Sequence, residues 1–362
     1  MTGAAENWES TIRQCADFYL KGNQRKRSDP DFSWQLVNGS PFSPSRLASR
    51  AIQFFGFKSA QRREWLTSNS ELLWAARSLL SDELSKLLFD QAIMVRMVGH
   101  ERFIFPRVNF DDLMEVDGET AFLSDSLPRD YLGLPLKVFD ARLNLNKQKK
   151  IPLRMVVNRG FFTMLNSYRQ YLIRRDSIDL IPSVGDVVLD CGSCIGDMSL
   201  VFAALVAECG EVHTFDPIPV HTRFCHYQAR LNPTLAHVLH INELAVGNCT
   251  RSVANSRVHP QRIDPAARMI DDFSSTTLDD YAAANLRKVD FIKMDIEGAE
   301  LDAIAGAEGI IREFKPRLAI SAYHRPEDFW LIPARLKAIN PDYQLYFGHH
   351  SPVQWESVFY AA

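Results

Sequence analysis

The sequence lacks a long apolar segment and an apolar leader. The longest candidate for a membrane span, residues 198–207, has about ten residues, whereas a membrane helix needs roughly twenty. The first ten residues include Glu6, Trp8 and Glu9 and have no apolar core, which is unlike a signal peptide. We therefore expect no membrane span and a cytoplasmic location.

An excess of charge of either sign is also absent. The 41 Lys and Arg residues balance the 44 Asp and Glu residues, so no overall attraction draws the chain to nucleic acid. The six cysteines lie among apolar and helical patterns and are expected to be reduced thiols. A chain of 362 residues can bury a large core without metal or disulfide. These features exclude a disordered tail, a fibre and a histone-like binder.

The patterning predicts two domains. Residues 1–150 form a mainly helical N-terminal extension, polar and loop-rich over residues 1–45 and helical over residues 46–98, with a hairpin near residues 134–157. Residues 151–362 form the second domain, which begins with a helical pattern over residues 161–174.

From residue 183 onward, short apolar strands alternate with helices, which favours an open parallel sheet covered by helices. The predicted helices include one over residues 299–314 and one over residues 326–339 that breaks or restarts at Pro333. The last two strands are joined by few residues and are expected to be antiparallel. The predicted strands cover residues 187–190, 212–216, 238–246, 289–295, 318–322, 343–347 and 353–360.

A glycine turn follows the first of these strands. Gly192 and Gly196 allow the backbone to turn tightly and to approach a ligand. Ligands of open α/β sheets bind at the carboxyl ends of the strands, where this turn lies. Asp216 comes twenty residues after Gly196, at the end of the second strand, where an acid can accept hydrogen bonds from ribose hydroxyls. The pair predicts a nucleoside-binding crevice.

The spacing D-x-G-x-x-x-G is not the dinucleotide pattern G-x-G-x-x-G. Asp190 before the turn and Asp197 at the helix start would repel a pyrophosphate but suit a ligand with a cationic part. S-adenosylmethionine, with an ammonium and a sulfonium, is such a ligand. An α/β domain whose glycines only close a turn remains the alternative.

These residues resemble the FkbM family of methyltransferases over roughly residues 160–362. The resemblance implies a class I methyltransferase sheet and an S-adenosylmethionine-dependent enzyme that methylates a hydroxyl of a sugar or polyketide-type product. Two departures are visible: Asp216 stands where the family more often has Glu, and Ser193-Cys194 replaces an Ala-Asn-like pair. The resemblance is carried by four segments: Asp190-Cys-Gly-Ser-Cys-Ile-Gly-Asp, His213-Thr-Phe-Asp-Pro, Ile292-Lys-Met-Asp-Ile-Glu-Gly-Ala-Glu300 and Tyr323-His-Arg-Pro.

Several polar residues follow the later strands. Asp295 and Glu297 are expected to contact the cofactor or the acceptor, although capping of the next helix is an alternative. His324 is expected to accept the proton of the acceptor hydroxyl. The remaining candidates are His349 and His350 for acceptor binding, and Tyr171, Asp190, Gly192, Ser193, Gly196, Asp216 and Asp295 for cofactor binding.

No metal site is predicted. Cys191 and Cys194 form a single pair inside the turn, with no second pair at suitable spacing. Asp295 and Glu297 could hold a divalent ion, but the sequence names no third ligand.

The sequence thus predicts in-line methyl transfer to a hydroxyl of a small molecule or glycan. A nicotinamide-dependent oxidoreductase and a catalytically degenerate cofactor-binding protein remain alternatives. Residues 1–150 are expected to shape acceptor binding or to form a homo-oligomer contact.

Overall fold

The chain divides into two compact units in a computed structural model. The first comprises residues 1–108 and 346–357, and the second comprises residues 109–345 and 358–362. No helix within the described ranges is long and apolar enough to cross a membrane. The described residues are 2–20, 59–99, 112–131, 133–144, 150–175, 178–251, 273–351 and 355–362.

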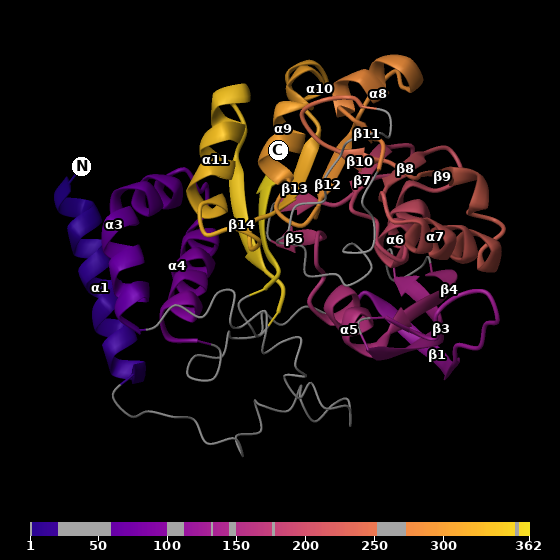
Figure 1. Cartoon of the computed structure of the whole chain (residues 1–362), viewed down its shortest axis with the longest axis horizontal. Helices are drawn as coiled ribbons and strands as arrows, with labels where there is room; N and C mark the ends of the chain where they lie inside the picture. Colours follow the sequence, from indigo (N-terminus) through magenta and orange to yellow (C-terminus); the bar gives the residue numbers. More distant parts are fainter. Residues whose placement is uncertain are drawn as a thin grey trace. The chain divides into compact units, whose positions relative to one another are not determined.

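In the part of the first unit that the structure describes, three helices pack on one another: α1 (Thr2–Leu20), α3 (Ser59–Ser78) and α4 (Glu83–Val98) (Figure 1). Asp82 caps α4 by accepting a hydrogen bond from Ser85 N. The helical prediction is confirmed for α3 and α4, while residues 46–58 lie outside the described residues.

The sequence predicted no helix in the first twenty residues, which are polar at first, whereas the structure has α1 there. The side chains of α1 that are buried recur every three or four residues, which is helical spacing. This stripe is narrow because polar residues occupy the positions between its members. The segment is therefore polar in overall composition, which hides the helical pattern. Its members are Ala5, Trp8, Ile12 and Ala16.

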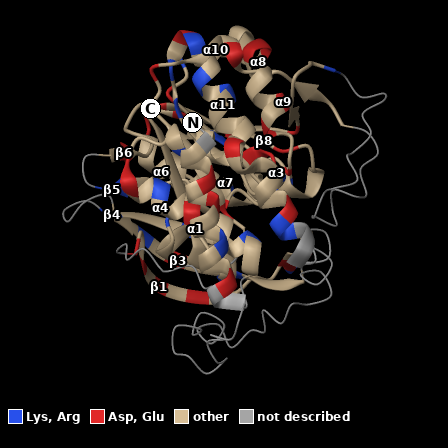
Figure 2. Cartoon of the chain, turned by 90° about the vertical axis from the view of Figure 1, so that its left-hand side faces the viewer, with Lys and Arg blue, Asp and Glu red and all other residues tan. Residues whose placement is uncertain are grey.

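The second unit begins with an antiparallel sheet in which β3 (Leu134–Asn144) pairs with β4 (Lys150–Asn158), β1 (Met114–Ala121) and β2 (Asp130–Tyr131). The predicted hairpin is confirmed. Strand β1 carries several acidic residues, which are coloured red along its ribbon in Figure 2. Their side chains pair with basic side chains of neighbouring segments, which keeps this surface charged. The pairs are Glu115–Lys150, Asp117–Arg142 and Glu119–Arg159.

Helix α5 (Arg159–Ser167) is shorter than predicted. Residues 173–175 and 178–180 instead form the strands β5 and β6, which pair antiparallel. Arg169 and Tyr171, between α5 and β5, have positive φ angles of 50° and 62°, which a helix cannot contain.

The main sheet has the order β14-β15-β13-β12-β7-β8-β9 (Figure 1). Strands β7, β8, β9, β12 and β13 pair in parallel, and β15 pairs antiparallel with β13. This arrangement confirms the predicted α/β class with an antiparallel last strand. The bounds are β7 Val187–Cys191, β8 Glu211–Phe215, β9 Leu239–Asn242, β12 Phe291–Met294, β13 Arg317–Ser321, β14 Leu345–His349 and β15 Ser357–Ala361.

The helices of this unit form two groups. Helices α6 (Asp197–Val206) and α7 (Pro219–Leu231) contact each other and β4. Helix α11 (Asp328–Ile339) contacts α9 (Glu300–Ala305) and α10 (Glu308–Phe314), and α10 contacts α8 (Leu278–Asn285).

Three predicted elements differ. The helix predicted over residues 299–314 breaks between α9 and α10, where a Cβ on Gly306 would lie 2.1 Å from the carbonyl oxygen of Gly247. Helix α11 runs through Pro333, because burial of neighbours such as Phe329 outweighs one lost backbone hydrogen bond. The strand predicted over residues 238–246 is two strands, β9 and β10 (Ala245–Val246), and β10 pairs with β11 (Ser275–Thr276).

Two side-chain amides, one on α7 and one at its C-cap, close the outer edge of β4. Gln228 accepts a hydrogen bond from Val156 N at 3.0 Å and donates to Val156 O at 2.7 Å. Asn232, one turn later, makes the same pair of bonds with the backbone of Arg154. The amides thus pair with the backbone of alternate residues, as a neighbouring strand would. The hairpin therefore belongs to the second compact unit, and the role of residues 1–150 as a separate extension stays a prediction.

We expect Gln228→Ala to lower the free energy of unfolding by about 2–4 kcal/mol, because buried backbone groups of Val156 lose their partners. Urea unfolding followed by circular dichroism measures this change. His226→Ala, at an exposed position of the same helix, should cost under about 0.5 kcal/mol. Equal effects of the two substitutions would contradict the edge-closing role.

Candidate active site

The glycine turn joins β7 to α6 and packs against the loop after β12. A Cβ on Gly192 would lie 1.8 Å from the carbonyl oxygen of Asp295, so no other residue fits there. Gly192 and Gly196 both have φ of +79°, in the left-handed region that favours glycine. Ser193 is buried, and its backbone N–H donates to Phe215 O. The predicted tight turn is confirmed.

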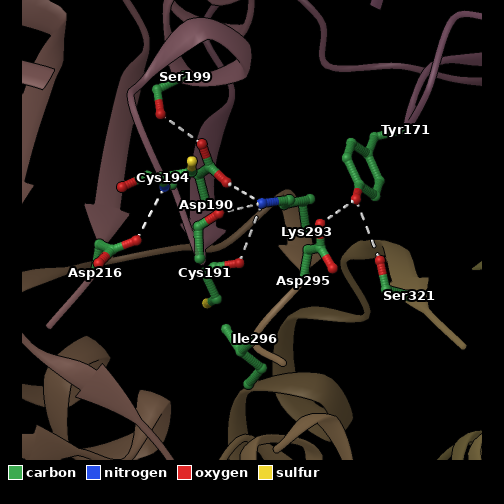
Figure 3. A network of polar contacts seen from close by, with 12 residues as sticks. Tyr171, Asp190, Cys191, Cys194, Ser199, Asp216, Lys293, Asp295, Ile296 and Ser321 are labelled. Carbon is green, nitrogen blue, oxygen red and sulfur yellow. Dashed lines mark hydrogen bonds and ion pairs between the residues drawn. The ribbon is translucent and has the colours of Figure 1, made fainter. Parts of the chain in front are cut away.

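A buried ion pair lies beneath this turn (Figure 3). Lys293 Nζ is 3.0 Å from Asp190 Oδ1 and donates to the carbonyl oxygens of Cys191 and Gly192. Ser199 donates to the other oxygen of Asp190. Burial alone would lower the pKa of Lys293, but the carboxylates of Asp190 and Asp295 outweigh it and raise the pKa. Asp190 therefore stabilises the turn through Lys293, which binds two of the turn's carbonyl oxygens.

Asp216 closes the turn from β8. Its carboxylate accepts hydrogen bonds from Cys194 N at 3.0 Å and Ile218 N at 2.9 Å. Nδ1 of the buried His221 lies 3.0 Å from Asp216 Oδ1. Asp216, the acid predicted to bind a ribose, therefore also holds the glycine turn in place.

Asp295 follows β12 and is surrounded by hydroxyl and cationic groups. Tyr171 and Tyr323 each donate a hydrogen bond to its carboxylate, at 2.7 and 2.8 Å. Tyr171 also lies 3.2 Å from Ser321 Oγ, so it joins the ends of β12 and β13. Burial would raise the pKa of Asp295, but His324, Lys293 and the two phenols lower it. Asp295 is thus an anion that these groups hold in place.

His324 follows β13 and faces three carboxylates. Its Nδ1 lies 2.9 Å from Glu300 Oε1, and its Nε2 lies 3.4 Å from Asp295 Oδ1 and 3.9 Å from Glu297 Oε2. Burial would lower the pKa of His324, but Glu300, Glu297 and Asp295 raise it well above its usual value.

This direction opposes the predicted base role of His324, because a protonated imidazole cannot accept another proton. Glu297 is the most exposed carboxylate of the cluster, with 37% of its side chain accessible, while Glu300 is fully buried. Glu297 has a φ of 59°, a left-handed conformation that is unusual for a residue other than glycine.

The sequence-predicted residues gather at one edge of the sheet, around the ends of β7, β8, β12 and β13. His349 and His350 belong to the other compact unit, where both are buried and His349 Nδ1 lies 2.9 Å from Ser357 Oγ. Their role in acceptor binding stays a prediction. The sequence analysis missed Lys293 and Tyr323. A lysine inside the apolar strand was the available signal for Lys293.

Two groups of metal-ligand side chains occur among the described residues. One contains Glu211, His213 and His240, and the other contains Asp295, Glu300 and His324. Neither includes a cysteine. Burial raises the pKa of the Cys191 thiol, which opposes the thiolate form that binds metals.

The sheet order and its glycine turn define a class I methyltransferase fold. Residues 190–350 match the family model described as the methyltransferase FkbM domain, which confirms the resemblance. The methyltransferase FkbM of Methylobacillus flagellatus KT is 20% identical with a TM-score of 0.52, and the match covers 82% of this chain and 60% of that protein.

More distant structures also match the chain. The fibrillarin of Aeropyrum pernix, with natively bound S-adenosyl-L-methionine, is 11% identical with a TM-score of 0.39, covering 68% of this chain and 99% of that one. The fibrillarin of Methanococcus jannaschii is 12% identical with a TM-score of 0.36, covering 71% and 96%. No curated protein matches the chain.

We expect Lys293→Met to lower the free energy of unfolding by about 3–5 kcal/mol, because the substitution leaves the charge of Asp190 buried and unpaired. Denaturant unfolding measures the loss. Lys288→Met is the matched control: Lys288 pairs with Asp290 at the surface, and such pairs contribute under about 1 kcal/mol. A loss that is no larger than the control's would contradict the stabilising role.

The raised pKa of His324 predicts a pH-dependent stability. A folded-state pKa above the unfolded value stabilises the fold fully below pH of about 6.5, and this contribution is lost as pH rises through the folded pKa. The stability advantage of the wild type over His324→Gln should therefore fall with rising pH, by at most about 1.4 kcal/mol per unit. Urea unfolding between pH 6 and 9, with a chelator present, tests this. An advantage that stays constant or grows with pH would refute it.

Proposed function

We propose that the chain is an S-adenosylmethionine-dependent O-methyltransferase that acts on a hydroxyl of a sugar, glycan or secondary metabolite. One observation carries the proposal: the glycine turn, the nucleoside acid Asp216 and the carboxylate cluster around Asp295 meet at one edge of the sheet. The FkbM domain match and the class I fold support methyl transfer.

The residues at this edge fit S-adenosylmethionine. Asp216 Oδ1 already contacts Ile218 N and His221 Nδ1, whereas Oδ2 accepts one hydrogen bond, from Cys194 N. A carboxylate oxygen has two acceptor sites, so Oδ2 retains capacity for a ribose hydroxyl. The turn from Gly192 to Gly196 offers the close backbone approach. Asp295 and Glu297 supply negative charge for an ammonium and a sulfonium. When bound, S-adenosylmethionine supplies a methyl group on a positively charged sulfur.

The protein contributes alignment and proton removal. Tyr171 and Tyr323 hold Asp295 by two hydrogen bonds, which keeps the end of β12 in a fixed position. His324 is held as a cation by its carboxylates, which leaves Glu297 as the accessible carboxylate that could take the acceptor's proton.

Two alternatives give different results with ligands. A nicotinamide-dependent oxidoreductase would place a pyrophosphate beside the carboxylates of this edge, which disfavours it. A degenerate protein would bind the cofactor without turnover.

The proposal also includes a role for residues 1–150, in acceptor binding or in a subunit contact. It further includes a cytoplasmic location and a small-molecule or glycan acceptor.

Calorimetric titration should show binding of S-adenosylmethionine and S-adenosylhomocysteine and no binding of NAD. Asp216→Ala should weaken this binding by roughly 1.5–3 kcal/mol, the range of hydrogen bonds to a charged group. Glu208→Gln, at an exposed position after α6, serves as the control and should leave binding unchanged. Preferential binding of NAD would refute the cofactor assignment.

Transfer of labelled methyl groups to a panel of glycosides, hydroxylated metabolites and amines tests the reaction. The proposal expects label on hydroxyl oxygens, with S-adenosylhomocysteine formed in equal amount. Label on amines alone would overturn O-methylation, and binding without transfer to any member would favour the degenerate protein.

A further inference from the structure

Two histidines and a glutamate, none of them used by the proposed function, gather on one face of the main sheet. Glu211 and His213 are two residues apart on β8, so their side chains point to the same face. His240 of β9 is the register partner of His213. The two imidazole rings are stacked, with centroids 4.4 Å apart. The register of two neighbouring strands thus brings together three side chains of the kinds that bind transition metals.

The donor atoms of this group are spaced for a single ion. One ligand atom from each of the three side chains lies within 4.8 Å of the other two. His213 Nε2 is 2.9 Å from Glu211 Oε2. Metal–ligand bonds of about 2.0–2.2 Å place neighbouring donor atoms about 3.0–3.5 Å apart. His240 is exposed, so its ring has room to close the remaining distance.

The second ring nitrogen of His213 is already held from outside the group. His213 Nδ1 lies 2.8 Å from the hydroxyl oxygen of Tyr281, on α8. Asn242, at the end of β9, donates a hydrogen bond to the same hydroxyl at 3.2 Å. These contacts orient the imidazole so that Nε2 faces Glu211. Metal-bound histidines commonly use their second nitrogen in this way, because the hydrogen bond fixes the ring for the ion.

The other two side chains are open to an ion from solvent. The Glu211 side chain is 49% accessible. The ring nitrogens of His240 make no hydrogen bond or ion pair with any residue that the structure describes. An ion can therefore reach all three donors without displacing a buried contact other than the bond between His213 and Glu211.

We propose that His213 Nε2, a ring nitrogen of His240 and a carboxylate oxygen of Glu211 bind Zn²⁺, and that Tyr281 positions His213. Two imidazoles and one carboxylate are a common ligand set for Zn²⁺ and leave a fourth position for water. The site goes beyond the proposed function and does not depend on it, because none of its ligands belongs to the cluster around Asp295.

Such an ion links the last two strands of the main sheet. Strand β9 ends the sheet order and, among the described strands, pairs with β8 alone. An ion held by side chains of both strands adds a connection beside their backbone hydrogen bonds. Because an ion that binds the folded chain preferentially stabilises it by mass action, Zn²⁺ should raise the stability of the protein. The role of the ion is structural, and no step of methyl transfer passes through it.

The test uses the full chain, freed of metal by a chelator and then titrated with Zn²⁺ by calorimetry. We expect one Zn²⁺ per chain at this site. Glu211→Gln and His240→Gln should each weaken its binding at least about tenfold, and Tyr281→Phe, which keeps the ring but removes the hydroxyl, by about 10–100-fold. Glu211 and His240 are exposed, so these two substitutions should spare the fold.

His237→Gln is the matched control, because His237 is an exposed histidine three residues before His240 and lies outside the ligand group. It should leave Zn²⁺ affinity unchanged. Absence of stoichiometric Zn²⁺, or an affinity that Glu211→Gln and His240→Gln leave intact, would overturn the site.

Thermal unfolding provides a second measurement. Zn²⁺ should raise the midpoint of the wild type and of His237→Gln, and should raise that of His240→Gln much less. An equal rise in all three proteins would contradict the link between β8 and β9. Titration of His240→Gln with S-adenosylmethionine keeps this proposal separate from the proposed function: cofactor affinity should equal that of the wild type, and a loss of cofactor binding in this variant would contradict the independence of the two sites.

Discussion

The buried pair of Asp190 and Lys293 is the interaction on which the site depends. The two residues are direct partners in the register of β7 and β12, so their charges meet across neighbouring strands. Lys293 also donates to the carbonyl oxygens of Cys191 and Gly192, at the start of the glycine turn. Without Lys293, these buried carbonyl groups would lack a hydrogen-bond partner and would lie near the unpaired charge of Asp190. The pair thereby fixes the turn against the loop after β12, at a separation that only glycine at position 192 permits.

The charges of the site follow from this pair. Because Asp190 engages Lys293, that lysine only partly offsets Asp295, which also faces His324. The excess of negative charge extends outward: burial, followed by the charge of Glu300, raises the pKa of Asp328 to about 7. The neighbouring carboxylates raise the pKa of His324, and a protonated imidazole has no free nitrogen to accept a proton. The histidine is therefore a poor base.

Local sequence signals predicted the parts of this structure that local rules control. The glycine turn follows from spacing and backbone freedom, and the strands of the main sheet follow from short apolar runs. Helix α1 was missed because its buried stripe is narrow, and Gly306 breaks a helix because of a distant backbone contact with Gly247. Such contacts leave no mark within a sequence window.

The state of a side chain was harder to predict than its place. The sequence located His324 at a strand end, but its protonation depends on Glu300 and Asp295, which reach it only through the folding of β12 and α9. Asp190 was likewise placed beside the turn, but its partner Lys293 lies about a hundred residues away. Charge is a property of the assembled cluster, so sequence spacing alone could not assign it.

The site has two halves with different origins. The half that suits a nucleoside is built by β7 and β8, where Asp216 closes the turn, and the half that suits an acceptor is built by β12 and β13. Tyr171, which precedes both in the chain, lies against the second half: its hydroxyl donates to Asp295, and its ring lies 5.2 Å from Lys293 Nζ. Lys293 lies on β12 and pairs with Asp190 of β7. The two halves are therefore joined by the same lysine that neutralises Asp190. A change at Asp216 disturbs one half, whereas a change at Lys293 disturbs both, because the turn and Asp295 use the same cation.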